Sequence, residues 1–276
     1  MKNLRGQNAI VTGASAGLGV EIARALAARS VHLALAARRL EPLRALAAEL
    51  AQTGVKTVAI QADVNDAAGR ERLVAEAESA LGPTDILINN AGVEIPVRFN
   101  AITDADLAET INTNVLARMR LAKLVLPGML ARGRGHIVNN GSMSGKVPVA
   151  GSSVYAASNA AIGMWSRSLR EELAGTGVSV SVVCAIYVTE VGVYAWKNMR
   201  APWILREVTP RQVVGAFMKA LERDRGEVLV TAMPVRPLLA LAALSPPFES
   251  WILRTFGARK FMLQLAEYVE RVRYGK

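Results

Sequence analysis

The sequence predicts an α/β fold in which helices cover both faces of a parallel sheet. Short apolar runs alternate with helical patterns from residue 7 to about residue 231. A run such as 31–36 is apolar at nearly every position, which is typical of a strand buried on both faces. A glycine-rich stretch separates the first run from the first helical pattern. Strands joined through helices in this way lie parallel, with right-handed crossovers.

Seven apolar runs give the expected strands, and the expected helices lie between them. The strands are predicted at 9–11, 31–36, 57–60, 85–88, 136–138, 178–183 and 228–230. After the first helix, further helices are predicted at 40–52, 67–81, 107–130, 155–174 and 211–223. The longest of them is expected to break near Pro127-Gly128, because proline removes a backbone donor.

Length and composition fit one large domain, or a domain with a tail. Of the 276 residues 51% are apolar, and the net charge is +10. The basic residues are scattered without interleaved aromatic residues, so nucleic acid is not expected as a partner. A single cysteine, Cys184, fits a reducing compartment. The first residues lack the apolar core of a signal peptide and no apolar run reaches the roughly 18 residues that span a bilayer, so a cytoplasmic protein is expected.

The stretch Thr12-Gly13-Ala14-Ser15-Ala16-Gly17-Leu18-Gly19 is predicted to bind a phosphate. It joins the first strand to the first helix, where backbone N–H groups and the helix dipole favour negative charge. Gly13 can make the turn, Gly17 leaves room for a pyrophosphate, and Gly19 lets the helix lie close to the sheet. Because the spacing differs from G-x-G-x-x-G, an ordinary turn between a strand and a helix is the alternative.

Ligands of such sheets bind at the carboxyl ends of the strands. Informative residues follow the strands at that edge: Arg38-Arg39, Asp63-Val64, Asn89-Asn90-Ala91-Gly92, Gly141-Ser142 and the stretch 185–189. After the second strand no Asp or Glu is present to bind a ribose hydroxyl. The two arginines suit a 2′-phosphate instead, which favours NADP over NAD.

Together these motifs resemble those of the short-chain dehydrogenase/reductase family. The resemblance covers about residues 5–232 and includes Asn114, Ser142 and Tyr155. It implies a Rossmann-type domain, doubly wound around a seven-stranded parallel sheet, that transfers hydride between NAD or NADP and a carbonyl or alcohol. It also implies a homodimer or homotetramer. We expect a dinucleotide-binding domain at 1–232, with a substrate loop at about 188–207, and a C-terminal helical tail at 233–276.

The resemblance implies roles for individual residues. Tyr155 would exchange a proton with the substrate oxygen, Ser142 would hydrogen bond to that oxygen, and Asn114 would hold a water of the proton relay. Free tyrosine titrates near ~10, so base catalysis at neutral pH needs a nearby cation. No metal ion is expected, and the implied cofactor residues are Gly13, Ser15, Gly17, Leu18, Gly19, Arg38, Arg39, Asp63, Val64, Asn90, Ala91, Gly92, Tyr155, Asn159, Ile186 and Thr189.

Three departures from the family pattern lie around the nicotinamide end of the predicted site. Asn159 occupies the place of the family's lysine, which holds the ribose and lowers the tyrosine pKa. A rate loss of ~10²–10⁴ is the expected consequence. Ala185-Ile186 replaces Pro-Gly, and Asn140-Gly141 replaces an apolar residue and a serine. The adenosine half of the site keeps the family pattern.

Three functions are compatible with these departures. The favoured one is an NADP-dependent oxidoreductase with a modified proton relay. The second is a non-redox enzyme that uses Tyr155, Ser142 and the new asparagines. The third is a protein that binds or senses NADP(H) without turnover. Cofactor turnover excludes the third, and product formed without cofactor oxidation indicates the second.

Apolar segments are predicted to shape the substrate site. The loop residues indicate a bulky lipophilic substrate or packing against a second subunit: Tyr194, Trp196, Met199, Trp203, Ile204 and Leu205. For the tail, a cover over the pocket or a dimer contact is favoured over a membrane surface. Glu94 and Arg98 belong either to the pocket or to a solvated loop. His32, His136 and Cys184 are expected to be structural residues of the sheet.

Overall fold

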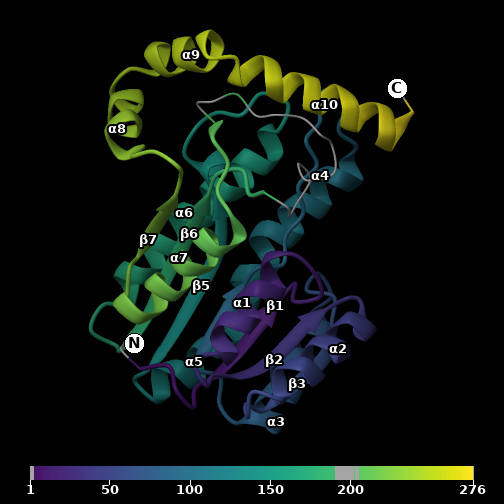
Figure 1. Ribbon diagram of the computed structural model, residues 1–276, viewed down its shortest axis with the longest axis vertical. Helices are drawn as coiled ribbons and strands as arrows, with labels where there is room; N and C mark the ends of the chain where they lie inside the picture. Colours follow the sequence, from purple (N-terminus) through teal and green to yellow (C-terminus); the bar gives the residue numbers. More distant parts are fainter. Residues whose placement is uncertain (1–2, 190–201, 203–204, 276) are drawn as a thin grey trace.

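The computed structural model describes residues 3–189, 202 and 205–275 (Figure 1). Within these residues seven strands form one parallel sheet in the order β3-β2-β1-β4-β5-β6-β7, which confirms the predicted fold class. The order reverses between β1 and β4, and a crevice for ligands is expected there. The strands are β1 (Asn8–Thr12), β2 (His32–Ala37), β3 (Thr57–Gln61), β4 (Ile86–Asn89), β5 (Gly135–Ser142), β6 (Val178–Ala185) and β7 (Glu227–Val230).

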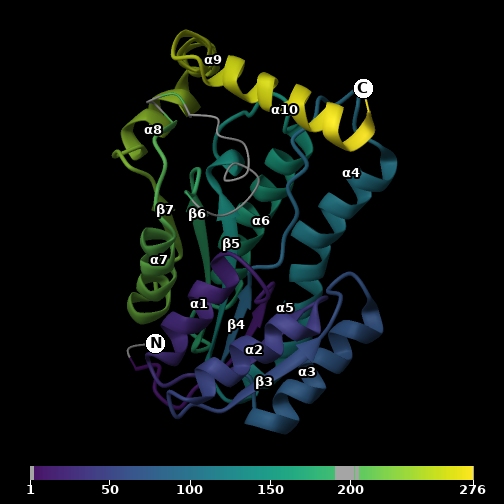
Figure 2. The ribbon, with the colours of Figure 1, turned by 45° about the vertical axis from the view of Figure 1, so that its right-hand side comes forward.

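Helices cover both faces of the sheet (Figures 1 and 2). One core lies under α1, α2 and α7 and contains Leu26 and Phe217, whereas the other lies under α3, α5 and α6 and contains Leu73. Successive strand residues enter opposite cores, as Val11 and Ile10 do. The helices of this layer are α1 (Leu18–Ala27), α2 (Leu40–Ala51), α3 (Ala67–Leu81), α4 (Asp104–Ile111), α5 (Ala117–Ala131), α6 (Ser153–Glu172) and α7 (Pro210–Arg223).

The long helix differs from its prediction. No break occurs at Pro127, which lies inside α5. The irregular part is instead a π-helical turn at Asn112–Leu116, which joins α4 to α5. Val125 and Met129 on either side of the proline are buried against the sheet, and this packing outweighs the lost hydrogen bond. A π turn inside a long helix often marks a functional site.

Strand β5 runs four residues beyond the predicted 136–138, because polar residues that suggested a loop continue to pair with β6. Asn139 pairs with Val182, and its buried side chain is satisfied on both sides. Its Nδ2 donates to Ser166 Oγ at 2.9 Å, and its Oδ1 accepts from Asn89 Nδ2 at 2.9 Å. The longer strand carries Ser142 to the carboxyl edge of the sheet.

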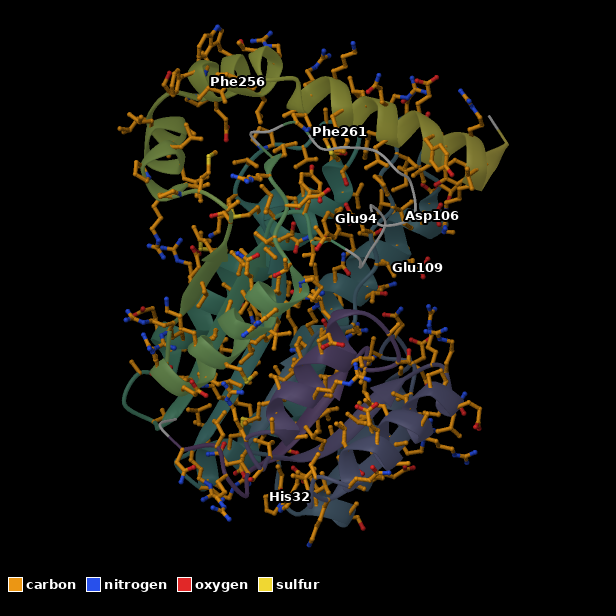
Figure 3. All side chains as sticks on the ribbon, viewed as in Figure 1. His32, Glu94, Asp106, Glu109, Phe256 and Phe261 are labelled. Carbon is orange, nitrogen blue, oxygen red and sulfur yellow. The ribbon has the colours of Figure 1, made fainter. Side chains whose placement is uncertain are left out.

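Three further helices, α8 (Arg236–Leu244), α9 (Pro246–Thr255) and α10 (Ala258–Tyr274), follow β7 and lie over the carboxyl edge of the sheet (Figures 1 and 2). On α10, Phe261, Met262 and Leu265 form a small core with Val149 and Tyr187. Figure 3 shows Phe261 at the junction between this helix and the body of the protein. The division of the chain at 232/233 remains a prediction. None of the described helices combines the length and the apolarity that crossing a membrane requires.

Candidate active site

The glycine turn after β1 has the geometry that a close ligand requires. Gly13 and Gly17 have φ values of 68° and 58°, which favour glycine. A Cβ on Gly13 would lie 2.9 Å from the Cα of Ala91, and one on Gly19 would lie 2.1 Å from the carbonyl oxygen of Gly13. Gly17 is the N-cap of α1 and has no side chain that could occupy the N–H groups of the first turn. These groups can therefore bind an anion.

Thr12 and Asn90 bind the turn to the end of β4. Thr12 Oγ1 donates to the carbonyl of Ile88 at 3.1 Å and accepts from the N–H groups of Asn90 and Ala91. The Asn90 amide donates to the carbonyls of Thr12, at 3.1 Å, and Gly13, at 3.3 Å. These bonds fix the crevice between β1 and β4, where the strand order reverses.

The residues expected to contact adenosine lie beside this turn, because β1, β2 and β3 are neighbours in the sheet. Arg38 and Arg39 follow β2 and are exposed. Arg39 Nη2 lies 3.4 Å from Ser15 Oγ, so this arginine already contacts the turn. Asp63 follows β3 and is exposed, whereas Val64 is partly buried against a core.

Asn114 occupies the π turn and connects two elements of the site. Its Oδ1 accepts from the N–H of Val93 at 2.9 Å. Its Nδ2 donates to the carbonyl of Val93 at 2.8 Å and to Ser158 Oγ, on α6, at 3.1 Å. All of its polar atoms are therefore used within the protein, and Asn114 holds the loop after β4 against α6.

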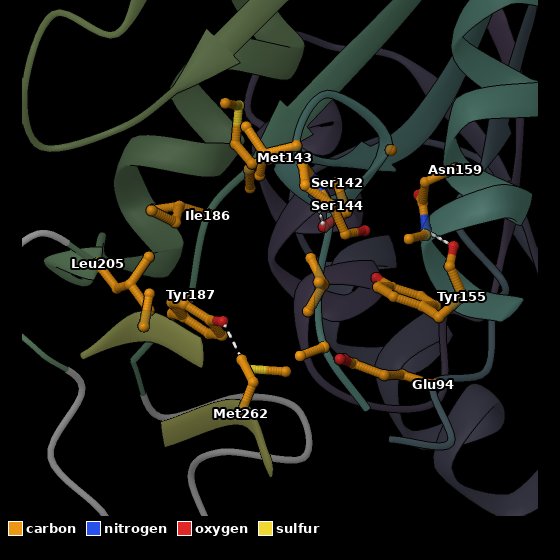
Figure 4. Close-up of a pocket in the computed structure, with 18 of the residues that line it drawn as sticks. Glu94, Ser142, Met143, Ser144, Tyr155, Asn159, Ile186, Tyr187, Leu205 and Met262 are labelled. Atoms are coloured by element: carbon orange, nitrogen blue, oxygen red, sulfur yellow. Dashed lines mark hydrogen bonds between the residues drawn. The ribbon is translucent and has the colours of Figure 1, made fainter. Parts of the chain in front are cut away.

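Tyr155 and Ser142 lie in the same cavity and hydrogen bond to each other (Figure 4). Burial raises the pKa of Tyr155 well above its usual value, and the carboxylate of Glu94 raises it further. A hydrogen bond with Ser142, the charge of Arg118 and a hydrogen bond with Asn159 lower it, but burial dominates. The phenol is therefore protonated at neutral pH and is suited to donate a proton.

Asn159 lies one turn after Tyr155 on α6 and is buried. Its Nδ2 donates to the carbonyl of Tyr155 at 3.0 Å (Figure 4). Glu94 lies beside Tyr155 in the same view. Of the two alternatives for this loop, the structure places Glu94 on the cavity wall, whereas Arg98 pairs with Glu270 of α10.

Sequence reasoning missed the buried charged residue of this wall. Arg118, on α5, is buried and lines the cavity together with Tyr155. Its Nη2 donates to the carbonyl of Ala91 at 3.0 Å and its Nη1 to the carbonyl of Asn140. Asn140 completes this cluster by donating from Nδ2 to Asn90 Oδ1 at 3.0 Å. The available signal was an arginine one helical turn after Asn114, on the same helix face.

The residues after β6 form the opposite wall of the cavity. Ala185 and Ile186 line it, and the Ile186 N–H donates to the carbonyl of Val230 at 3.1 Å. Thr189 Oγ1 is buried and, in the described part of the chain, has no hydrogen-bond partner. A buried hydroxyl without a partner requires one, and a carboxamide at this edge would supply it. This hydroxyl and the glycine turn fit a nicotinamide dinucleotide.

One cavity of about 950 Å³ contains the tyrosine and continues under the tail. Its inner part is formed by Gly17, Asn90, Ser142 and Tyr155, and its outer part by Leu239, Ile252, Leu253 and Met262. Tyr187 donates to the sulfur of Met262 at 2.9 Å, which joins the tail to the loop after β6 (Figure 4). The tail therefore covers the pocket. Of the loop residues singled out for a lid, Leu205 lines the cavity, whereas Tyr194, Trp196, Met199, Trp203 and Ile204 lie outside the described residues.

The remaining candidates lie in the sheet, as expected. His136 is buried in β5 and bonds to Ser181 Oγ at 2.7 Å, and burial lowers its pKa to about 3. Cys184 is buried in β6, and burial raises the pKa of its thiol to about 12, which makes it unreactive at neutral pH. His32 begins β2 and lies near the lower end of the molecule in Figure 3, far from Glu94. Among the described residues no cluster of three or more His, Cys, Asp or Glu side chains could hold a metal ion.

A doubly wound sheet with a glycine turn at its switch point and a tyrosine–serine pair in the same crevice defines a nicotinamide-dependent oxidoreductase. Comparison with known proteins makes the class more specific. The chain belongs to the short chain dehydrogenase family, whose model matches residues 7–198.

Relatives and solved structures agree with this assignment. The chain is 40% identical over 272 residues to ketoacyl reductase HetN of Nostoc sp., covering 97% of this chain and 95% of that protein. It is 31% identical over 261 residues to the very-long-chain 3-oxoacyl-CoA reductase of Mycosarcoma maydis, covering 90% and 72% of the two chains. The fold is similar to that of an actinorhodin polyketide ketoreductase variant with NADPH, with a TM-score of 0.74 and 30% identity over 81% of this chain and 95% of that one.

Proposed function

We propose that this protein is an NADP(H)-dependent oxidoreductase that acts on the carbonyl or alcohol of a lipophilic substrate, with an atypical proton relay. The observation that carries the proposal is the pairing of Tyr155 with Ser142 inside a largely apolar cavity that continues from the glycine turn. The named activities of the relatives, which reduce ketoacyl compounds, support a β-keto or similar carbonyl substrate. Leu239, Ile252 and Leu253 would contact its apolar part.

The residues of the chain would have the following roles in cofactor binding and proton transfer. The glycine turn and the first turn of α1 would hold the pyrophosphate, with Asp63, Val64 and the Asn90-Ala91-Gly92 turn near the adenosine and ribose. Bound NADPH would supply the hydride. Ser142 would hydrogen bond to the substrate oxygen, and Tyr155 would give that oxygen a proton. At neutral pH the phenol of Tyr155 is protonated, which is the form that reduction requires.

Cofactor choice would depend on Arg38 and Arg39. Both are exposed after β2, where they can reach a 2′-phosphate, and no carboxylate competes at this position of the sequence. Thr189, with its buried and unpartnered hydroxyl, would bind the carboxamide. A metagenomic short-chain oxidoreductase with NADP is 31% identical to this chain, with a TM-score of 0.70 over 82% of this chain and 97% of that one, which supports this choice.

We further propose that Asn159 replaces the lysine that the family pattern has at this place. Its amide hydrogen bonds to the Tyr155 carbonyl, and it can bind a ribose hydroxyl but adds no charge. This substitution favours a second candidate, a protein that binds NADP(H) without turnover. We also propose that the protein acts in the cytoplasm, consistent with its one buried cysteine, and forms a homodimer or homotetramer.

The test compares the wild type with Asn159→Lys. Each protein is titrated with NADPH and NADH by fluorescence, and NADPH oxidation is then followed with a panel of lipophilic β-keto esters and ketones. We expect tighter binding of NADPH than of NADH, and turnover by the wild type. Binding without turnover that the lysine restores would show a scaffold whose activity was lost at this position. Binding without turnover in both proteins would support a sensing or non-redox role.

A further inference from the structure

Arg118 is a buried cation on the cavity wall, and its hydrogen-bond acceptors among the described residues are uncharged. Its side chain is 6% exposed, on the inner wall of the cavity. The acceptors of its hydrogen bonds are backbone carbonyls, of Ala91 and Asn140. In the described part of the chain no carboxylate forms an ion pair with it. A buried guanidinium with only neutral partners is costly, so its charge calls for a functional explanation.

The charge is fixed in position. Arg118 lies one helical turn after Asn114, so the two side chains share a face of the helix. Both lie directly under Gly92, where a Cβ would be 2.9 Å from Arg118 Nη2 and 3.1 Å from Asn114 Oδ1. The two carbonyl acceptors lie after β4 and at the end of β5, so the guanidinium bridges two strands. Burial lowers the pKa of Arg118 only to about 10, so it is charged at neutral pH.

This charge acts on the tyrosine. Arg118 and Tyr155 interact electrostatically, each favouring the charged form of the other. Asn159, on the helix that carries Tyr155, is neutral. Among the charges that act on the phenol, the carboxylate of Glu94 raises the pKa of Tyr155 and the guanidinium of Arg118 opposes it, so the positive charge comes from α5 rather than from the next turn of α6.

We propose that Arg118 is a positioning residue that supplies Tyr155 with the positive charge which Asn159 lacks. This inference rests on the proposed function. The two tasks of the family's lysine would then belong to two residues. Asn159 would bind the ribose, and Arg118 would stabilise the tyrosinate that remains when the proton has moved to the substrate. Removing the guanidinium should therefore change proton transfer without abolishing cofactor binding.

The test uses Arg118→Gln, Arg118→Lys and the double variant Arg118→Gln/Asn159→Lys. Arg120→Gln, at an exposed position of the same helix, is the matched control. Two quantities are measured, with NADP for oxidation and for the absorbance titration, and with NADPH for reduction. One is the pH dependence of kcat in both directions. The other is the ionisation of Tyr155, followed by ultraviolet difference absorbance against Tyr155→Phe, which needs no turnover.

In Arg118→Gln we expect Tyr155 to ionise at least one pH unit higher than in the wild type, and alcohol oxidation at neutral pH to fall at least tenfold, because each pKa unit changes the tyrosinate fraction about tenfold. Arg118→Lys and Arg120→Gln should ionise within about half a unit of the wild type. The double variant should recover oxidation to within about threefold of the wild type.

Two results would overturn the inference: an unchanged Tyr155 ionisation in Arg118→Gln, or an activity loss that Asn159→Lys does not restore. If Arg118→Gln does not fold, Arg118→Met, which keeps the aliphatic stem, takes its place. Should both fail to fold, Arg118→Lys decides, because a shift of one unit or more despite the retained charge would contradict the proposal. A wild type without turnover would contradict the proposed function, whereas the absorbance titration would still test Arg118.

Discussion

Gly19 shows how closely a single residue controls the cofactor site. A methyl group there would lie 2.1 Å from the carbonyl oxygen of Gly13 and 2.9 Å from the Cα of Ala14, both of which are backbone atoms that cannot rotate away. The start of α1 and the turn before it would have to separate. This displacement would move the N–H groups that we expect to hold the pyrophosphate.

We therefore expect Gly19→Ala to weaken NADPH binding at least tenfold and to lower the free energy of unfolding by about 1–3 kcal/mol, since overpacking shifts the backbone. Fluorescence titration and urea unfolding measure the two effects. Gly215→Ala is the matched control, because this exposed glycine of α7 has nothing within 4 Å of an added Cβ. It should stabilise the protein by about 0.5–1 kcal/mol. Equal NADPH affinity in the two variants would contradict the geometry.

At this scale, motif spacing was a good guide to which residues come together but not to their partners. The resemblance to the family implied that Ser142 and Tyr155 act on the same oxygen, and the structure brings them into one cavity. It did not reveal Arg118, because an arginine inside a helical pattern normally lies on a solvated face. Its burial depends on the carbonyls of Ala91 and Asn140, which other strands bring to it.

Among the elements, helix α10 is attached to the body of the protein by polar contacts as well as by apolar packing. Asp106, in the first turn of α4, accepts hydrogen bonds from Arg273 and Tyr274 near the end of α10. The bond from Arg273 is the main reason that the pKa of Asp106 falls to about 2. Because the folded-state pKa is depressed, this stabilisation is present above the unfolded value near ~3.9 and is lost as the pH falls toward 2.

Asp106→Asn should lower the free energy of unfolding by about 1 kcal/mol at neutral pH, a modest value because the Arg273 side chain is 44% exposed. The difference from the wild type should shrink between about pH 4 and pH 2. Urea unfolding across this range, with hydrogen exchange of α10, measures it. Asp104→Asn removes an exposed carboxylate from the same helical turn and controls for the helix dipole. A pH-independent difference would show that Asp106 acts through packing alone.

The bounds of most elements followed from periodicity and turn residues, and α3 begins and ends where it was predicted. Local patterns could not predict the π turn at Asn112–Leu116 inside the long helix. At this turn Asn114 contacts Val93 and Ser158, which are distant in the sequence. A cover over the pocket was one of the two favoured positions of the tail, but the contacts that attach it could not be predicted. These contacts include pairs such as Arg98 with Glu270, which are 172 residues apart in the chain.

For the whole molecule, the net charge of +10 bears on cofactor capture. A positive protein attracts an anionic ligand at long range, and salt screens this attraction. NADPH carries one more phosphate than NADH. The two cofactors should therefore respond differently to ionic strength.

We expect kcat/KM for NADPH to fall several-fold between about 20 mM and 500 mM salt, and kcat/KM for NADH to fall less. Steady-state kinetics with a fixed lipophilic substrate measures both, and sucrose at matched viscosity controls for diffusion. An identical salt dependence for the two cofactors would indicate that the 2′-phosphate is not met by positive charge, and would count against the role proposed for Arg38 and Arg39.

The long-range attachment of α10 also bears on how the chain folds. Contacts between distant parts of a sequence form late, because the intervening chain must be ordered first. Most strand pairs of the sheet join strands that follow each other in the sequence, although α1 also packs on α7, and the contact of Glu270 with Arg98 completes the cover over the cavity. Until then the apolar outer wall of the cavity, including Ile252 and Met262, faces water. The surface that we propose to bind a lipophilic substrate is thus an aggregation hazard in the nascent protein.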